Sequence, residues 1–305
     1  MAKIRSHASI TMSTYHTPVM VREVLEGLNV QPGEKYIDAT LGGGGHTWEI
    51  VKQGGIVLGI DADTDALVHA QERLETEKRE MPTAGSWKLV QGNFRDIQHI
   101  AKENGFEKVS GILMDLGVSS YQLDTPEKGF SYRFLDGPLD MRLDRTQGET
   151  VAKFIKSASE EELYEIFTKF GEEERARAIV HALIRTRQVK KIVTVGQLLG
   201  AIDKAIGTGS DKYAVYSRIF QSLRIYINDE LGALRESLSG TEELLRPGGR
   251  LAVISFHSLE DRIVKQFMRE GNWKRIAKKP ISADESEVIH NRRSRSAKLR
   301  IVEKV

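Results

Sequence analysis

Four consecutive glycines, at positions 42–45, follow an apolar segment (residues 36–41) and precede a short helical pattern. A second apolar segment, residues 56–60, ends in Asp61. Strand, glycine turn, helix, strand and acid in this order are typical of a βαβ unit that binds a nucleoside. The glycines allow positive φ and close approach of a ligand, and the acid can accept ribose hydroxyls. A plain tight turn with a capping aspartate is the simpler alternative.

The spacing of this turn separates two classes of ligand. A dinucleotide fingerprint needs glycine at its first, third and sixth positions, but the sixth position counted from Gly42 is Thr47. The segment fits Asp-x-x-x-Gly-x-Gly instead, from Asp38 through Gly42 and Gly44. S-adenosylmethionine (SAM) has no pyrophosphate to bind, and acids attract its ammonium and sulfonium groups. We therefore predict a SAM site with Asp61 at the ribose.

The surrounding sequence repeats the alternation of strand and helix, which predicts a parallel sheet with helices on both faces. The predicted strands are residues 36–41, 56–60, 87–90 and 109–114, and the predicted helices are residues 46–52, 65–80 and 94–103. Near the start, Thr17 and Pro18 precede an apolar stretch, residues 19–25. This predicts a helix with Thr17 as its N-cap and Pro18 as its first residue.

The alternation stops after residue 123. Residues 124–228 contain almost no strand-like segments, and helices are predicted after a capping box at Ser159 and at residues 172–187, 194–206 and 213–227. The pattern then returns with helix 229–245, turn 246–250, strand 251–256, helix 258–269 and last strands at 273–277 and 298–303. We predict an α/β domain, residues 1–123 and 228–305, with an inserted helical domain, residues 124–227.

Composition excludes several classes of protein. The 305 residues include no cysteine, so neither a disulfide framework nor a thiolate metal site is expected. No apolar run approaches the ~20 residues of a membrane span. The polar residues 1–14 lack the apolar core of a signal peptide, so we expect a cytoplasmic protein. The eight histidines form no metal-ligand pattern, and no metal is predicted.

The net charge of +2 is unevenly distributed. Residues 273–305 hold ten Lys/Arg and four Asp/Glu, a local charge of +6, which leaves −4 for the rest. The densest basic stretch contains Arg292, Arg293, Arg295 and Lys298. Such side chains contact phosphate, so we predict that they bind RNA. A solubilising terminus is the alternative.

The fourth predicted strand ends in Asp115, just before a Gly-Ser turn. In a doubly wound sheet the carboxyl ends of the strands line the ligand crevice. We therefore expect Asp115 near the methionine end of SAM or near the methyl acceptor. An Asx-turn is the alternative.

Several longer motifs extend this interpretation. They are His16-Thr17-Pro18-Val19, Gly44-Gly45-His46, residues 115–124, Gly129-Phe130-Ser131, residues 136–142 and residues 255–262. Together they resemble the MraW/RsmH family of bacterial SAM-dependent methyltransferases, which act on cytosine N4 in the decoding region of 16S ribosomal RNA. The resemblance runs from about residue 15 to residue 305. It implies a class I methyltransferase fold, a Rossmann-like doubly wound sheet whose last strand is antiparallel, with an inserted helical domain that recognises RNA.

The resemblance also implies a set of site residues and a substrate. The implied SAM contacts are Gly44, Gly45 and His46 at the turn, Asp61 at the ribose, Phe94 on the adenine, and Asp115 and Gln122 completing the pocket. The implied substrate is 16S ribosomal RNA, within the small ribosomal subunit.

Methyl transfer to cytosine N4 requires help at the nucleophile, because the N4 lone pair is delocalised into the ring. An acceptor for an N4 hydrogen would localise that pair. The predicted acceptor is Asp115 or the Ser119-Ser120 turn beside it, with His257 as second candidate. His257 has an equal alternative as the cap of helix 258–269. The flipped base must also be stacked, for which Phe130, Tyr132, Phe134 and Phe256 are candidates.

Two other functions remain open from sequence. One is a SAM methyltransferase for DNA or another RNA base, although such amine methyltransferases usually carry Asp/Asn-Pro-Pro-aromatic where this chain has Asp115-Leu116-Gly117-Val118. The other is a SAM-binding ribosome assembly factor without essential catalysis.

Overall fold

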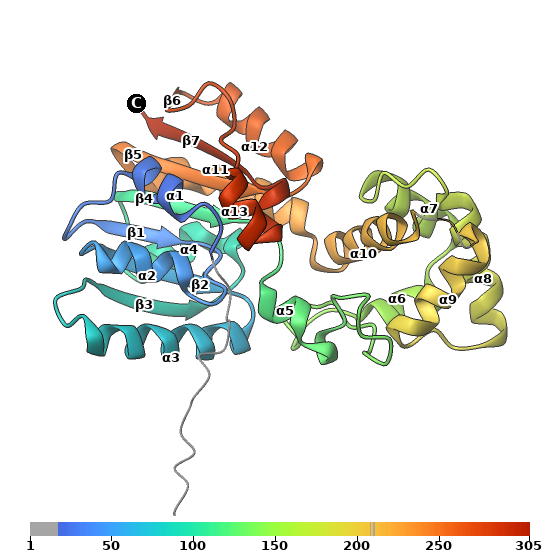
Figure 1. The fold of residues 1–305 in the computed structure, drawn as a ribbon. Coiled ribbons are helices and arrows are strands. Elements are labelled where there is room, and N and C mark those ends of the chain that lie inside the picture. Colours follow the sequence, from blue (N-terminus) through green and yellow to red (C-terminus); the bar gives the residue numbers. More distant parts are fainter. Residues whose placement is uncertain (1–17, 208, 210) are drawn as a thin grey trace, which may run out of the picture.

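A computed structural model describes residues 18–305 except residues 208 and 210. Its centre is a seven-stranded sheet in the order β3-β2-β1-β4-β5-β7-β6 (Figure 1). The strands are β1 (Lys35–Asp38), β2 (Ile56–Asp61), β3 (Ser86–Gln91), β4 (Val109–Asp115), β5 (Leu245–Ser255), β6 (Trp273–Arg275) and β7 (Lys298–Lys304). Strands β1 to β5 are parallel, and β7 is antiparallel to both β5 and β6. The predicted Rossmann-like sheet with an antiparallel last strand is confirmed.

Helices cover both faces of the sheet because its strands alternate apolar side chains to either side. One face packs on α4 (Ile97–Glu103), α11 (Glu230–Leu244) and α12 (Ser258–Glu270). The other packs on α1 (Val21–Leu28), α2 (Gly45–Lys52) and α3 (Thr64–Glu80). In β4, for example, Ile112 and Met114 belong to the first core and Leu113 to the second. This is the period-two pattern of a strand buried on both sides.

The segment between β4 and β5 is helical, and Figure 1 shows most of it to one side of the sheet. Its helices are α5 (Ser120–Asp124), α6 (Val151–Ser157), α7 (Glu160–Lys169), α8 (Ala176–Val189), α9 (Val195–Ile206) and α10 (Lys212–Asn228). Apolar side chains of α6 to α10 pack together with Val118, Phe130, Leu139 and Met141. This segment therefore has a hydrophobic core beside that of the sheet.

The remaining elements are short. They are the 3₁₀ helices η1 (Phe94–Asp96), η2 (Pro126–Lys128) and η3 (Arg292–Ser296), and the helix α13 (Glu285–His290). None of the helices within the described residues is long and apolar enough to cross a lipid bilayer.

The predicted start of α1 is wrong. Thr17 lies outside the described residues, and Pro18 and Val19 precede the helix, which begins at Val21 after Met20 in a left-handed conformation. Pro18 lies against Gly45, and the carbonyl of Val19 contacts His46. These residues pack on the glycine turn, so they do not start the helix.

Two further boundaries differ from the prediction. Helix α8 begins at Ala176, and not at residue 172, because the Glu173 carboxylate accepts the Arg175 N–H and binds Arg218, which shapes a turn. Strand β5 begins at Leu245, ahead of the predicted turn at 246–250. The turn is an interruption within that strand, where the partner shifts from Val109 to Gly111.

Candidate active site

A pocket lies at the carboxyl ends of β1, β2 and β4. The strand order reverses between β1 and β4, and ligands of open α/β sheets bind at such a switch point. Of the predicted site residues, the lining includes Gly45, His46, Asp61, Phe94, Asp115, Gln122 and Arg293. Gly44 and His257 are not among the lining residues.

The glycine turn brings backbone to the pocket wall. Gly42 has φ 51° and lines the pocket, and Gly44 has φ 72° as the N-cap of α2. A Cβ atom on Gly45 would lie 2.9 Å from Pro18 Cγ, so a side chain there would displace the segment that closes the turn. Positive φ and close packing explain why this loop requires glycine.

Asp61 joins the end of β2 to the glycine turn. Its Oδ2 accepts the Gly42 N–H at 2.8 Å, and its Oδ1 accepts the Asp63 N–H at 2.9 Å. Burial raises the pKa of Asp61 to about 6, against the opposing effect of these two hydrogen bonds. Each oxygen keeps a second lone pair, so the carboxylate can shape the turn and also accept a ligand hydroxyl.

Asp115 and His46 face each other across the pocket floor. The Oδ1 atom of Asp115 is buried without a hydrogen-bond partner, and its Oδ2 atom lies 3.7 Å from His46 Nδ1. His46 Nε2 lies 2.8 Å from the Val19 carbonyl oxygen, which can only accept, so Nε2 carries a proton. Burial raises the pKa of Asp115 to about 6, with His46 and then Arg293 opposing the rise. Asp115 therefore lines the pocket and keeps one buried carboxylate oxygen without a hydrogen-bond partner.

Gln122 lines the pocket and is held by its neighbours. Its Oε1 accepts the Ser119 N–H at 2.9 Å, and its Nε2 donates to Asp63 Oδ2 at 3.0 Å. Asp63 also binds the ammonium of Lys128, with Nζ 2.8 and 2.7 Å from its two oxygens. A buried ion pair thus supports the wall of the pocket.

Asp38, the acid that the sequence placed before the turn, does not line the pocket. Its side chain is buried, where Oδ2 accepts the Thr47 hydroxyl at 2.7 Å and Oδ1 accepts the Thr40 N–H at 3.3 Å. Burial raises its pKa. This acid holds the glycine turn in shape and does not face the ligand.

The four predicted RNA-binding residues divide into two groups. Arg292, Arg295 and Lys298 are exposed, and Lys298 Nζ lies 3.8 Å from Asp261 Oδ2. Arg293 instead reaches into the pocket, where its guanidinium donates to Ser120 Oγ at 2.7 Å and to the Val118 carbonyl. Burial lowers the pKa of Arg293, against the attraction of Asp115. The run of basic residues in the sequence did not show that Arg293, in η3, points into the pocket.

His257 caps α12, as the alternative interpretation allowed. Its Nδ1 accepts the Glu260 N–H at 3.4 Å, and its Nε2 lies 3.1 Å from Glu260 Oε1. Ligand atoms of Glu230, His257 and Glu260 lie within 4.8 Å of one another. However, both oxygens of Glu230 bind the Arg224 guanidinium, at 2.8 and 3.0 Å. The cluster is held by this ion pair, and we assign it no metal.

Some pocket residues gave no signal in the sequence. Asn228 and Glu230 reach the pocket from the α10–α11 junction, and Asn93 precedes Phe94. Asn228 Nδ2 donates to the Met141 carbonyl at 2.8 Å, and its Oδ1 accepts the Leu143 N–H at 2.8 Å. A polar residue at a helix junction is too common a pattern to mark a site.

The switch-point pocket, its glycine turn and the acid that ends β2 define a class I SAM-dependent methyltransferase. The chain belongs to the MraW methylase family, whose model matches residues 13–305.

Curated relatives match over nearly the whole chain. The chain is 42% identical to the ribosomal RNA small subunit methyltransferase H of Carboxydothermus hydrogenoformans, over 96% of this chain and 99% of the relative. It is 45% identical to the protein of the same name from Deinococcus deserti, over 96% of this chain and 94% of the relative. The corresponding protein of Deinococcus radiodurans is 44% identical, over 95% of this chain and 89% of the relative.

Proposed function

We propose that this chain transfers a methyl group from SAM to the N4 amine of a cytidine in the decoding region of 16S ribosomal RNA, within the small ribosomal subunit. The near full-length similarity to ribosomal RNA small subunit methyltransferases supports the substrate class. The observation that carries the chemistry is the buried, unpartnered Oδ1 of Asp115 at the pocket.

The donor set of the pocket fits SAM. Asp61 offers free lone pairs to ribose hydroxyls, and Phe94 lies in the lining as a surface for the adenine. The carboxylates of Asp115 and Glu230 also belong to the lining and suit a ligand with an ammonium and a sulfonium. Bound SAM supplies an electrophilic methyl group whose leaving group is a neutral thioether.

Asp115 accepts the proton of the target amine in this proposal. The N4 nitrogen forms a bond to the methyl carbon as the carbon–sulfur bond breaks, and one N4 hydrogen passes to the ionised carboxylate. Ser119 Oγ already accepts the Gln122 N–H, and Ser120 Oγ already accepts from Arg293. Each serine oxygen has one lone pair left, whereas Asp115 Oδ1 has no partner and belongs to a carboxylate that can take up a proton, which supports Asp115 as the acceptor. For His257, its capping contacts add no support to a catalytic function.

His46 and Arg293 position this carboxylate. His46 is fixed by its bond to the Val19 carbonyl, and Arg293 holds the loop after β4 through Val118 and Ser120. Both oppose the rise in the pKa of Asp115 and so favour its ionised form. The exposed Arg292, Arg295 and Lys298 are proposed to contact RNA phosphate, and residues 124–227 to form a separate domain that recognises the RNA.

Incubation of the protein with labelled SAM and purified small subunits, followed by nucleoside analysis, tests the function. Label on N4-methylcytidine of 16S RNA is the expected result. Label on another base, or on DNA, would replace the proposed substrate. SAM binding without label would indicate an assembly factor.

The rate should depend on pH through Asp115. Its pKa is raised to about 6, so the carboxyl is protonated and unable to accept a proton below that pH. We expect kcat to rise with pH and to level off above about pH 6 to 7. Single-turnover rates at saturating SAM measure this rise of the rate with pH. A rate that stays constant from pH 5 to 7 would argue against Asp115 as the acceptor.

Replacing Asp61 by asparagine should weaken SAM binding. The carboxylate accepts a backbone N–H on each oxygen, whereas an amide can accept on one only, so either the turn or the ribose contact is lost. We expect the Kd for SAM to rise about 10- to 100-fold, equivalent to ~1.5–3 kcal/mol. Titration calorimetry measures it, and Asp96→Asn, at an exposed carboxylate, is the control. Equal affinities of the two variants would contradict the assignment.

A further inference from the structure

Several basic side chains of the helical segment pair with an acid. Arg142 binds Asp140, Arg218 binds Glu173, and Arg224 binds Glu230. Arg133, Lys169 and Arg175 pair with Asp124, Glu165 and Asp211. Arg187 donates to the carbonyls of Ile155 and Ala158, each at 2.7 Å. These side chains are therefore engaged by groups of the protein itself.

The α8/α9 groove, in contrast, gathers several cations on one surface. It consists of two adjoining depressions that share Thr186, Lys190 and Lys204, with Arg185 and Lys191 completing its cations. Within the described residues, none of these four cations forms an ion pair; the Lys204 ammonium lies 3.5 Å from Thr186 Oγ1.

Few groups in the groove oppose this charge. Among the residues that the structure describes, Asp136 is the one carboxylate of its lining, and His181 on the rim lies 3.4 Å from Glu160. Leu135 and Val189 are the only large apolar side chains of the described residues that line it. A protein partner would normally need a larger apolar centre in such a surface. An open groove with clustered, uncompensated cations suits a phosphate backbone instead.

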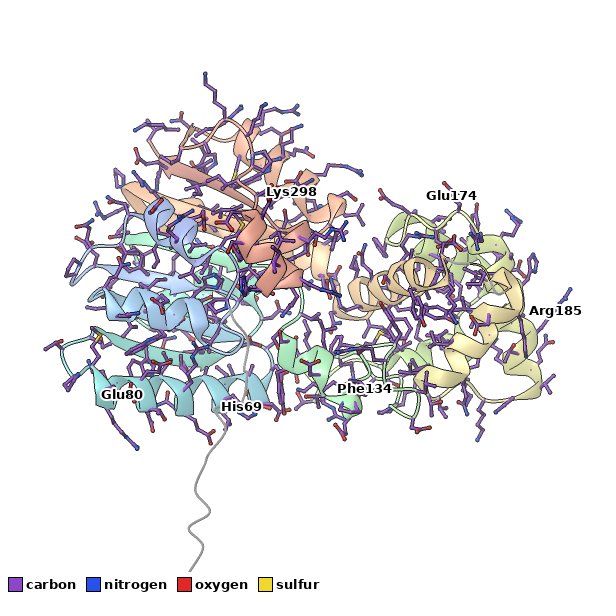
Figure 2. All side chains as sticks on the ribbon, in the orientation of Figure 1. His69, Glu80, Phe134, Glu174, Arg185 and Lys298 are labelled. Carbon is purple, nitrogen blue, oxygen red and sulfur yellow. The ribbon has the colours of Figure 1, made fainter. Side chains whose placement is uncertain are left out.

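The groove is far from the methyltransferase pocket. Figure 1 shows α8 and α9 at the end of the helical segment opposite the sheet, and Figure 2 shows Arg185 at that end. A ligand that contacts both sites must therefore be extended or large, as a folded ribosomal RNA is. We propose that the α8/α9 groove binds the phosphate backbone of the substrate RNA at a site remote from the target nucleotide. This inference rests on the proposed function and adds a second contact surface to it.

A matched pair of double variants tests the groove. Lys190→Gln with Lys204→Gln removes two groove charges, and Lys153→Gln with Lys156→Gln removes two exposed charges of α6 outside the groove. Binding of small subunits is measured from low to moderate salt by filter retention. For the groove variant we expect affinity about tenfold weaker. The slope of log K against log salt should be about 1.4–1.8 shallower, because each of the two lost phosphate contacts changes that slope by ~0.7–0.9. The loss should appear in KM for subunits rather than in kcat, and the α6 variant should retain the wild-type slope.

Two outcomes would overturn the inference. One is an equal slope of log K against log salt for the two variants. The other is a groove variant that loses affinity for subunits but binds naked 16S RNA like wild type, because this result would indicate that the groove binds a ribosomal protein. Equal melting temperatures of both variants exclude misfolding, and Arg185→Gln repeats the test at a third position. If wild-type protein forms N4-methylcytidine while the slopes are equal, only the groove assignment fails. If wild type forms no methylated RNA, the proposed function fails, whatever the slopes.

Discussion

Replacing Asp115 by asparagine is expected to lower kcat for RNA methylation by about 100- to 1,000-fold, in the range attributed to a positioned general base. The amide preserves the size of the side chain but cannot take a proton from N4. Its NH₂ group would also direct hydrogens toward the amine or toward His46, where the carboxylate offers only acceptors. Single-turnover methylation of small subunits at saturating SAM measures the effect.

The control for this experiment is the affinity for SAM. Asp115→Asn should bind SAM within a few-fold of wild type, since Asp61 and the glycine turn are unchanged. The fall of the methylation rate below about pH 6 should be absent in this variant, because the titrating carboxyl group has been removed. Asp96→Asn should methylate like wild type. A variant that bound SAM normally and methylated at the wild-type rate would remove Asp115 from catalysis.

Replacing Lys128 by methionine is expected to destabilise the protein by about 3–5 kcal/mol, as for other broken buried ion pairs. The Lys128 side chain is 2% exposed, and its ammonium binds Asp63 at 2.7 Å and Asp65 at 2.8 Å. Burial acts to lower the pKa of Lys128, but these hydrogen bonds outweigh it and raise that pKa. Without the ammonium, Asp63 would be a buried charge whose remaining partners are Gln122 and the Asp65 N–H.

Urea unfolding and the melting temperature measure this loss, and a fall of about 10 °C is expected. Lys153→Met, at an exposed lysine, is the control and should change stability by less than about 0.5 kcal/mol. The double variant with Asp63→Asn should lose less than the sum of the two single variants, because removal of both charges leaves neither one unpaired. Additive losses would show that the pair is not coupled.

Much of the sheet was predictable because its signals are local. Apolar runs and glycine turns report on residues a few positions away, so β1, β2 and β4 were found with Asp61 and Asp115 at their ends. The start of α1 was wrong for the same reason. Thr17 and Pro18 carry a local helix-start pattern, whereas contacts of Pro18 and Val19 with the glycine turn, more than twenty residues on, decide the outcome.

The contents of the site were less accessible from sequence. Resemblance implied His46 and Gln122, but their hydrogen-bond partners Val19 and Asp63 carry no motif that marks them. Arg293 was expected on an RNA-facing surface because it belongs to a run of basic residues. Such a run shows where positive charge lies in the sequence but not which way each side chain points. Its guanidinium contacts Val118, 175 positions earlier in the chain.

The sequence by itself determined the order of the elements, the glycine turn that excludes a dinucleotide fingerprint, and the acids at the strand ends, since periodicity and turn chemistry are properties of neighbouring residues. Only the tertiary structure decided that Asp38 supports the turn from inside and that Lys128 is buried between Asp63 and Asp65. It also decided that Asp115 lines the pocket and has one carboxylate oxygen without a hydrogen-bond partner. The burial and the ion pairs of these side chains depend on segments that are distant in the sequence and come into contact only when the chain folds. A local sequence pattern therefore cannot predict them.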